Sequence, residues 1–348
     1  MAPARDDARV PLTVLTGFLG AGKTTLVNRI LRGAHGRRIA VVVNEFGAVS
    51  IDHDLIVGSR EQIVPMPNGC VCCIVRGDLI VALHRLLDRR KGRLWRKAVP
   101  FDYVLIETSG LADPGPVAQT LVGDERLHRE MRLDGTVTLV DALWGPRHLD
   151  DGKVALEQVA FADVIVVNKT DLVAETDLPP LEARLHAMNP LATLVRARDA
   201  DVDLARVLDL HAFDVRRRLA LDPDFLARVH DPAHAHDARV SAFVLESDEP
   251  LDPDALQTWV LDWVERHWLN VYRAKGVVNV AGERRRFVFQ TVHRTFAVAP
   301  DRLWEEGERR RTQIVFIGRY LGEVEDELRT GFERCRSRPG PSASYADR

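Results

Sequence analysis

Glycines, a lysine and a threonine follow one another in residues 17–24 with a spacing that suits phosphate binding. The segment reads Gly-Phe-Leu-Gly-Ala-Gly-Lys-Thr, a full Walker A pattern between a predicted strand, Val10–Thr16, and a predicted helix, Lys23–Arg32. Glycines let backbone N–H groups close around a phosphate, and the helix start favours negative charge. We expect Lys23 to contact the β- and γ-phosphate oxygens and the Thr24 hydroxyl to hold Mg²⁺. The predicted phosphate-binding residues are Gly17, Phe18, Leu19, Gly20, Ala21, Gly22, Lys23, Thr24 and Thr25.

A second motif, Asn168-Lys169-Thr170-Asp171, follows Val164–Val167, an apolar run that is typical of a buried strand. The Asp171 carboxylate can accept hydrogen bonds from N1–H and the 2-amino group of guanine, whereas adenine offers neither donor. Asn168 would support the loop and the base edge. The tetrapeptide alone also suits an ordinary polar turn, but its place at a strand end, downstream of the phosphate motif, predicts a guanine site that includes Lys169.

Carboxylates follow two further predicted strands. Glu107-Thr-Ser-Gly110 ends the strand Tyr103–Ile106, where a Walker B acid belongs, so we expect Glu107 to orient a Mg²⁺-bound or attacking water. Gly110 would let a backbone N–H approach the γ-phosphate. The segment after strand Ile39–Val43 suits a switch that orders around γ-phosphate and Mg²⁺. Its residues are Asn44, Glu45, Gly47 and Asp52, and the predicted catalytic residues are Lys23, Thr24 and Glu107. The alternative is that these carboxylates only cap helices.

Three of the four cysteines stand together in Cys70-Val71-Cys72-Cys73, and Cys335 stands apart. In a reducing compartment such a cluster indicates a metal or redox site rather than a disulfide framework. Three thiolates can converge on one transition-metal ion, and the fourth position would be filled by water, Glu45 or a histidine. The alternative is a buried or redox-active cysteine cluster.

Histidines form a second candidate metal site at His230, His234 and His236. They lie in a stretch rich in Pro, Asp and Ala without hydrophobic periodicity, which indicates a linker over residues 216–237. An accessory metal role and a solvated hinge both remain open for these three side chains.

The order of the predicted elements defines the fold class. The first half alternates buried strands with helices, which predicts a P-loop NTPase with a doubly wound, mostly parallel sheet over residues 1–215. After the linker, residues 238–335 predict a smaller α+β domain, and residues 336–348 a disordered tail. Further strands are expected at Gln62–Met66, Thr136–Val140, Val240–Leu245, Val277–Val280, Phe287–Thr291 and Gln313–Ile317, and further helices at Gly77–Arg90, Asp177–Met188, Val202–Leu210 and Glu323–Glu333.

Composition excludes several other classes of protein. The 348 residues carry 48 Lys and Arg against 51 Asp and Glu, so the net charge of −3 predicts no nucleic-acid or anionic-membrane partner. The charged N-terminus, Met1–Val10, lacks the apolar core of a signal peptide, and no apolar run has the length of a membrane span. The expected location is the cytosol.

Together the motifs resemble the CobW-like family of GTP-dependent metallochaperones, from Val10 to about Tyr320. The resemblance rests on GFLGAGKTTLVN (Gly17–Asn28), NEFGAVSID (Asn44–Asp52), GCVCCIVR (Gly69–Arg76), ETSGLADP (Glu107–Pro114) and NKTD (Asn168–Asp171), and in the second domain on RAKG (Arg273–Gly276), FQTVH (Phe289–His293) and IVFIGR (Ile314–Arg319). It implies phosphate and Mg²⁺ binding at Gly17–Thr24, guanine binding at Asn168–Asp171 and metal binding at the three clustered cysteines. Family members often have a longer His-rich stretch, so the short one here argues against high-capacity metal buffering.

The resemblance implies GTP hydrolysis that loads or releases an ion on a client metalloprotein, with GTP and GDP as nucleotides and a homodimer left open. Zinc is the first expectation for the metal because of its abundance and its thiolate ligation. The alternatives are cobalt for a cobalamin pathway, and iron or cobalt for a nitrile hydratase-type client. Two other classes also remain open: a P-loop small-molecule kinase or ATPase with a structural zinc, and a metal sensor that binds nucleotide without hydrolysing it.

Overall fold

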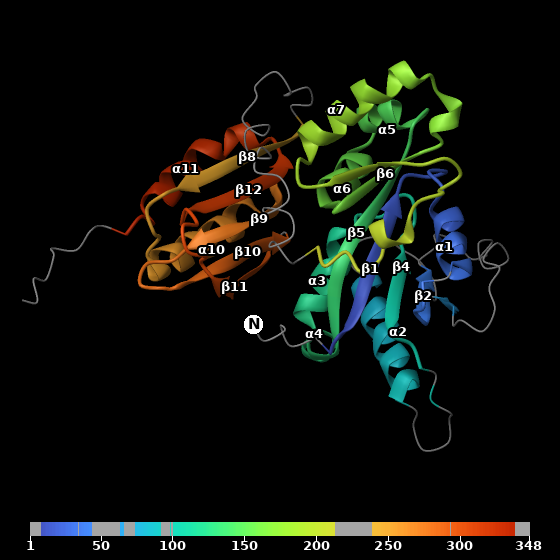
Figure 1. Cartoon of the computed structure of the whole chain (residues 1–348), viewed down its shortest axis with the longest axis horizontal. Coiled ribbons are helices and arrows are strands. Elements are labelled where there is room, and N and C mark those ends of the chain that lie inside the picture. Colours follow the sequence, from blue (N-terminus) through green and yellow to red (C-terminus); the bar gives the residue numbers. More distant parts are fainter. Residues whose placement is uncertain are drawn as a thin grey trace, which may run out of the picture. The chain divides into compact units, whose positions relative to one another are not determined.

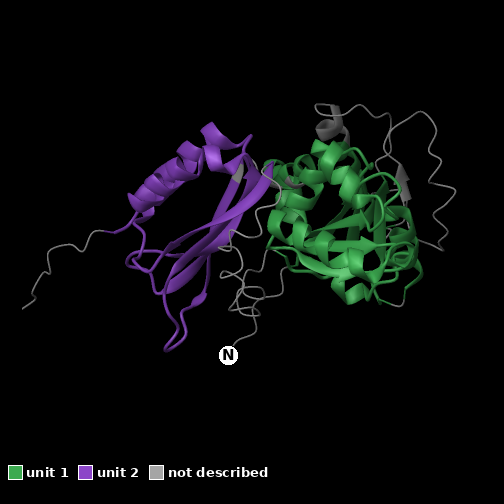
Figure 2. Ribbon diagram, turned by 90° about the horizontal axis from the view of Figure 1, so that it is seen from above, with its two compact units in different colours: residues 1–214, 233–237 green, residues 215–232, 238–348 purple. Residues whose placement is uncertain are grey.

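The computed structural model describes residues 8–33, 35–43, 63–65, 74–91, 98, 100–212, 239–292 and 294–337. Contacts divide the chain into two compact units, residues 1–214 with 233–237 and residues 215–232 with 238–348 (Figure 2). The predicted linker, 216–237, lies outside the described residues, so the limits of the domains stay a prediction.

A seven-stranded sheet forms the centre of the first unit (Figure 1). Its strand order is β3-β2-β4-β1-β5-β6-β7, and each of these neighbouring pairs is parallel. The strands are β1 (Val10–Gly17), β2 (Ile39–Val43), β3 (Ile63–Pro65), β4 (Tyr103–Glu107), β5 (Met131–Asp141), β6 (Val164–Asn168) and β7 (Thr193–Arg196). The order reverses at β1, so the loops after β1 and β4 meet at a point where an open α/β sheet binds its ligand.

Helices cover both faces of this sheet, and each face has its own hydrophobic core. One core contains Leu26 and Ile30 of α1, and the other contains Leu83 of α2 and Val117 of α3. The helices of the unit are α1 (Lys23–Arg32), α2 (Ile74–Lys91), α3 (Gly115–Gly123), α4 (Glu125–Glu130), α5 (Gly145–Asp151), α6 (Lys153–Phe161) and α7 (Leu178–Met188). The predicted doubly wound P-loop fold is confirmed.

One predicted helix is wrong. Residues 202–210 contain only a single 3₁₀ turn, Leu204–Arg206, which Asp203 caps by accepting a hydrogen bond from the Ala205 N–H. The chain then runs past the buried carboxylate of Asp134, which accepts hydrogen bonds from the N–H groups of Leu210 and His211. These backbone groups are therefore bonded to a side chain rather than to a helix, which the local apolar spacing could not reveal.

The second unit is a five-stranded antiparallel sheet with two helices on one face (Figure 2). The strand order is β11-β10-β9-β12-β8, and the core beneath the helices is rich in aromatic side chains. The elements are β8 (Val240–Ser247), α10 (Pro253–His267), β9 (Val271–Asn279), β10 (Arg285–Val292), β11 (Thr295–Leu303), β12 (Thr312–Arg319) and α11 (Glu325–Glu333). This confirms the predicted second α+β domain.

Two strands of this unit differ from the prediction. Strand β9 begins six residues before the predicted Val277. The prediction missed its start because Arg273 and Lys275, which are buried within the strand at 3% and 4% exposure, interrupt its apolar pattern. Strand β11 was not predicted, since it contains Pro300 and Asp301, residue types that are depleted in strands.

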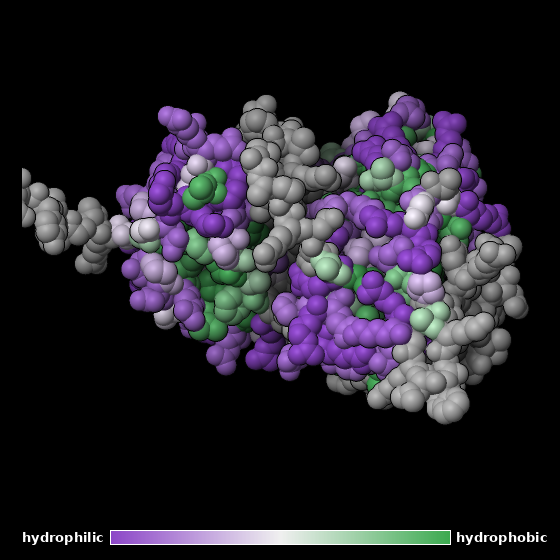
Figure 3. Space-filling view, turned by 60° about the horizontal axis from the view of Figure 1, so that its bottom comes forward, coloured by the Kyte–Doolittle hydropathy of each residue, from purple (hydrophilic) through white to green (hydrophobic). Residues whose placement is uncertain are grey.

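The surface is mixed in polarity. On the face shown in Figure 3, hydrophilic side chains predominate, with smaller hydrophobic areas between them. Among the described residues, no helix combines the length and the apolar character that crossing a membrane would need.

Candidate functional site

The phosphate motif forms the turn between β1 and α1, and steric crowding explains why two of its positions are glycine. Gly17 has a φ of 139°, and a Cβ there would lie 2.4 Å from the carbonyl oxygen of Leu139. Gly22 has a φ of 106°, and a Cβ would lie 2.4 Å from Nδ2 of Asn168. Any other residue at either position would therefore force the loop away from the neighbouring strands.

Lys23 is folded back over this loop. Its Nζ donates hydrogen bonds to the carbonyl oxygens of Gly17, at 2.8 Å, and Phe18, at 3.1 Å. Only 8% of the residue is exposed. The structure thus places an ammonium group at the centre of the loop, where it can exchange carbonyl contacts for phosphate oxygens.

Thr24 and Glu107 meet across the sheet edge. The Thr24 hydroxyl, in the first turn of α1, donates to Oε1 of Glu107 at 2.9 Å, and Glu107 ends β4 with 3% exposure. A hydroxyl and a carboxylate in contact are hard oxygen donors of the kind that Mg²⁺ prefers. These two residues therefore fit the predicted magnesium site.

The loop after Glu107 packs directly on the phosphate loop. Thr108 donates a hydrogen bond from its hydroxyl to that of Thr16 at 2.8 Å. A Cβ on Gly110 would lie 2.7 Å from the backbone nitrogen of Leu19, so only a glycine allows this approach. The predicted partners Gly110 and the phosphate loop are thus brought together.

Asn168 holds two loops with its side-chain amide. Its Nδ2 donates to the carbonyl oxygen of Ala21 at 2.9 Å, and its Oδ1 accepts from the N–H of Ala200 at 2.7 Å. The residue is 1% exposed. Asn168 therefore links the phosphate loop to the loop after β7, as expected for a supporting residue.

Lys169 and Asp171 complete the motif. Lys169 adopts a left-handed conformation with a φ of 60°, and its Nζ lies 2.7 Å from Oδ2 of Asp141, the last residue of β5. Asp171 lies in the 3₁₀ turn Thr170–Leu172 and is exposed. Its carboxylate is accessible to a ligand that brings hydrogen-bond donors.

Asp141 and Gln158 belong to this site but escaped the sequence-based prediction. Asp141 could have been found, because it ends a buried strand in the same way as Glu107 does. Gln158 of α6 donates from Nε2 to the carbonyl oxygens of Gly110, at 3.2 Å, and Ala112, at 3.1 Å. Its only signal is an amide among the apolar residues of that helix.

Several predicted site residues lie outside the described residues. They are the switch residues Asn44, Glu45, Gly47 and Asp52, the cysteines Cys70, Cys72 and Cys73, and the histidines His230, His234 and His236. Within the part of the chain that is described, no three His, Cys, Asp or Glu side chains form a group that could hold a metal ion. The remaining cysteine, Cys335, is buried, and burial raises the pKa of its thiol to about 11.

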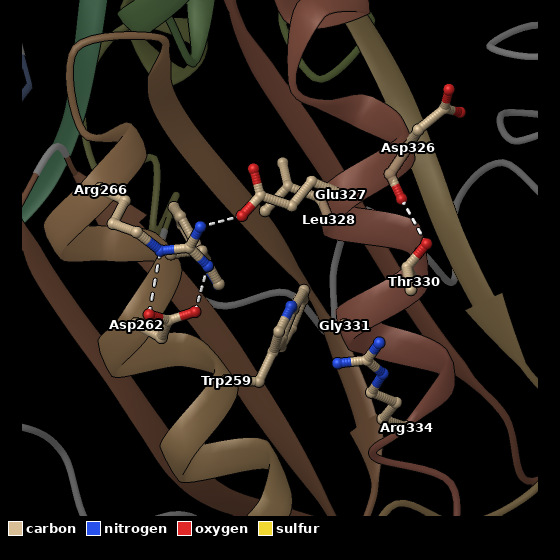
Figure 4. Close-up of a pocket in the computed structure, with 10 residues that line it drawn as sticks. Trp259, Asp262, Arg266, Asp326, Glu327, Leu328, Thr330, Gly331 and Arg334 are labelled. Atoms are coloured by element: carbon tan, nitrogen blue, oxygen red, sulfur yellow. Dashed lines mark hydrogen bonds and ion pairs between the residues drawn. The ribbon is translucent and has the colours of Figure 1, made fainter.

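The second unit contains a separate hollow of about 390 Å³ between α10 and α11 (Figure 4). Trp259 and Gly331 line it, and a Cβ on Gly331 would collide with the indole at 2.4 Å. Arg266 forms ion pairs with both Asp262 and Glu327 at its edge. The charged residues that line the hollow are Asp262, Asp326, Glu327, Arg266 and Arg334, so it has no strong excess of either charge.

Comparisons with known proteins agree on one family. Residues 11–196 match the family model described as "CobW/HypB/UreG, nucleotide-binding domain", and residues 240–336 match "Cobalamin synthesis protein cobW C-terminal domain". The zinc chaperone YjiA of Escherichia coli is 36% identical, over 94% of this chain and 99% of its own. The zinc-regulated GTPase metalloprotein activator 1 of Schizosaccharomyces pombe is 32% identical, over 90% and 84%.

A solved structure shows the same likeness in three dimensions. The crystal structure of Zn(II)-bound YjiA GTPase from E. coli matches with a TM-score of 0.73 and 32% identity, covering 94% of this chain and 99% of the other. Both family models and this whole-chain match cover the two units in the same order. The chain therefore belongs to the CobW family of P-loop GTPase-fold proteins.

Proposed function

We propose that the protein is a GTP-hydrolysing metallochaperone, which holds a transition-metal ion on its clustered cysteines and passes it to a client metalloprotein under nucleotide control. The observation that carries the proposal is the contact of Thr24 with Glu107 beside the folded-back Lys23, all at the edge where the guanine motif also lies. Relatives named as zinc chaperones and zinc-regulated GTPases support it.

At the phosphate end, binding would exchange protein contacts for nucleotide contacts. The Lys23 ammonium would leave the carbonyls of Gly17 and Phe18 for the β- and γ-phosphate oxygens. Thr24 and Glu107 would hold Mg²⁺, which neutralises charge on these oxygens when it is bound. Glu107 would also orient the attacking water by accepting its hydrogen bond. Slow intrinsic turnover is expected, as for other GTPases of this kind before a partner supplies an arginine.

At the base end, the exposed carboxylate of Asp171 would select guanine. It can accept hydrogen bonds from N1–H and the 2-amino group, and an adenine base would leave it without donors. Lys169, fixed by Asp141, would lie next to the base with its side-chain stem.

The cargo would be held by the thiolates of Cys70, Cys72 and Cys73. Zinc is the proposed ion because thiolate ligands suit it and because the named relatives are zinc proteins. Cobalt stays the alternative. A reducing compartment such as the cytosol would keep these thiols available.

The test is the coupling between nucleotide and metal. Zinc affinity is titrated against a chromophoric chelator with a non-hydrolysable GTP analogue and Mg²⁺, and again with GDP. We expect the two affinities to differ by roughly 5- to 150-fold, the usual range of an allosteric coupling. By linkage, zinc must change the affinity for the GTP analogue by the same factor.

Cys335 supplies a matched control for the cysteine variants. Cys72→Ala should remove the difference between the two nucleotide states and leave GTP binding intact. Cys335→Ala should leave zinc affinity unchanged, because this buried thiol has a raised pKa and its Sγ contacts the carbonyl oxygens of Ala255 and Gly331. Equal zinc affinities in both nucleotide states would leave a GTPase with a structural metal and refute the chaperone function.

A further inference from the structure

Gln158 is a buried polar side chain outside every motif of the proposed GTP site. It is 1% exposed and lies on α6 between the buried apolar residues Leu156 and Val159. Its Nε2 nevertheless reaches the loop after β4 and bridges two carbonyl oxygens, those of Gly110 and Ala112. Both N–H groups of this buried amide donate to the same loop. Because buried donors need acceptors in fixed directions, these two bonds fix the position of the loop relative to α6.

The loop that Gln158 holds is the one that carries Glu107 and Gly110. It is fixed at three points by three different elements. Glu107 accepts from Thr24 of α1, Thr108 donates to Thr16 of β1, and Gln158 of α6 holds the far end. The first two contacts secure the start of the loop, so the position of the Gly110 backbone depends on the third.

Helix α6 is itself firmly anchored where Gln158 lies. The hydroxyl of Thr138 on β5 donates to the backbone carbonyl oxygen of Gln158 at 2.7 Å. At the end of the helix, Nδ2 of Asn189 donates to the carbonyl oxygens of Val159, Ala160 and Ala162 at 2.7, 3.2 and 2.9 Å. The amide of Gln158 therefore projects from a rigid support.

The same α5–α6 segment also touches the phosphate loop. The rings of Phe18 and His148 of α5 lie 4.1 Å apart. A Cβ on Gly152, between the two helices, would lie 3.8 Å from the Phe18 ring. One continuous segment thus contacts both loops that surround the proposed γ-phosphate position.

We propose that Gln158 is a positioning residue for GTP hydrolysis, acting through the Gly110 loop; this rests on the proposed function. Gly110 already abuts Leu19, so the loop cannot move further toward the phosphate loop, and Gln158 prevents it from moving away. The Gly110 backbone is thereby held where its N–H can meet the γ-phosphate. GDP lacks that phosphate and gains nothing from this arrangement.

The test variant is Gln158→Met, which keeps nearly the same volume and removes both N–H donors. We expect kcat for GTP to fall at least about tenfold with little change in KM, because misplacing a group near the reacting atoms acts mainly on the chemical step. The affinity for a non-hydrolysable GTP analogue, measured by displacement of a fluorescent guanine nucleotide, should fall relative to that for GDP. Gln158→Glu should behave similarly, since a carboxylate cannot donate to carbonyl oxygens.

Thr312→Val is the matched control. It removes an equally buried polar group, a hydroxyl that accepts a hydrogen bond from the N–H of Asn279 at 3.0 Å in the second unit, so it should lower the melting temperature while keeping kcat and the preference for the GTP analogue. If Gln158→Met retains wild-type kcat and nucleotide preference, or lowers the affinities for both nucleotides equally along with the melting temperature, Gln158 is only structural. A wild-type protein without GTP hydrolysis would instead refute the proposed function, and the nucleotide preference would still test Gln158.

Discussion

The phosphate end and the base end of the site differ in how far the protein satisfies its own polar groups. At the phosphate end, Lys23 is bonded to two carbonyl oxygens of its loop, and Thr24 is bonded to Glu107. At the base end, Asp171 is exposed on a single 3₁₀ turn. The chain alone thus has side chains that hydrogen-bond to one another or to their own loop at one end, and an accessible carboxylate at the other.

This difference assigns different tasks to the two ends. Phosphate oxygens must replace hydrogen bonds that the protein already makes. The net binding free energy therefore comes from the greater strength of charge-assisted hydrogen bonds, and it increases as charge develops in the transition state. Guanine instead donates hydrogen bonds to a carboxylate that is open to solvent. Its binding free energy at Asp171 therefore determines how strongly guanine is preferred over adenine. The phosphate end is therefore expected to control turnover, and the base end to control which nucleotide enters.

The largest expected effect is at the phosphate end. Lys23→Ala removes the only side chain that the structure places within the loop as a cation, and kcat should fall by roughly 10²-fold or more, the loss typical of a missing electrostatic stabiliser. The measurement is steady-state phosphate release with saturating GTP. Lys91→Ala, at an exposed lysine paired with Glu130, serves as the control and should keep wild-type turnover. If Lys23→Ala hydrolyses GTP normally, the reaction takes place elsewhere.

A smaller effect, confined to selectivity, is expected at the base end. Asp171→Asn should weaken GTP binding by roughly 10- to 150-fold, corresponding to about 1.5–3 kcal/mol for hydrogen bonds to a charged group, and should admit xanthosine nucleotides. The reason is that an amide offers a donor where guanine also offers donors, while xanthine carries an oxygen at that position. Affinities are measured by competition against a fluorescent nucleotide.

Asp177→Asn controls for the loss of a nearby charge. Asp177 is also exposed, six residues further along the chain, and makes no capping hydrogen bond with its side chain. It should leave base preference unchanged. Equal affinities of the wild-type protein for ATP and GTP would contradict the role of Asp171 and remove the contrast between the two ends.

Local patterns predicted the residues of both ends, and long-range contacts explain what they missed. The limits of α1 and β2 agree with the predicted Lys23–Arg32 and Ile39–Val43, because a phosphate motif and a β-branched run define them locally. The roles of Asp141 and Gln158 depend on partners 28 and 48 residues away. Sequence alone offers no measure of such pairing.

The failed helix prediction at 202–210 has the same origin. Its apolar spacing suits a helix, yet Asp134, 76 residues earlier, binds the N–H of Leu210 and draws the chain along the sheet. The carboxylate also accepts from the hydroxyl of Tyr103, whose pKa burial raises. A buried acid on a distant strand thus overrode a local preference.

The smallest expected effect concerns His148. Its ring packs against the ring of Phe18, so it adds an aromatic contact to the hydrogen bonds of the phosphate loop. Burial lowers the pKa of His148 below its ordinary value, and the nearby carboxylates of Asp141 and Asp151 offset this in part. The unfolded chain therefore binds a proton at a higher pH than the folded chain does. The contribution of neutral His148 to the free energy of unfolding is therefore complete above about pH 6.5, the ordinary histidine pKa. It is lost as the pH falls through the lower pKa that His148 has in the folded protein.

His148→Phe should remove this part of the pH dependence. Protonated His148 would also gain attraction to the Phe18 ring, which opposes the loss, so we expect less than about 1 kcal/mol between pH 7.5 and 5.5. The measurement is urea unfolding of both proteins over that range, compared as a difference so that the other histidines cancel, together with a proton NMR titration of His148. Two results would contradict this prediction: a His148 pKa at or above 6.5, or a wild-type protein that gains stability relative to His148→Phe as the pH falls. Either would show that the histidine is solvated and does not pack on the phosphate loop.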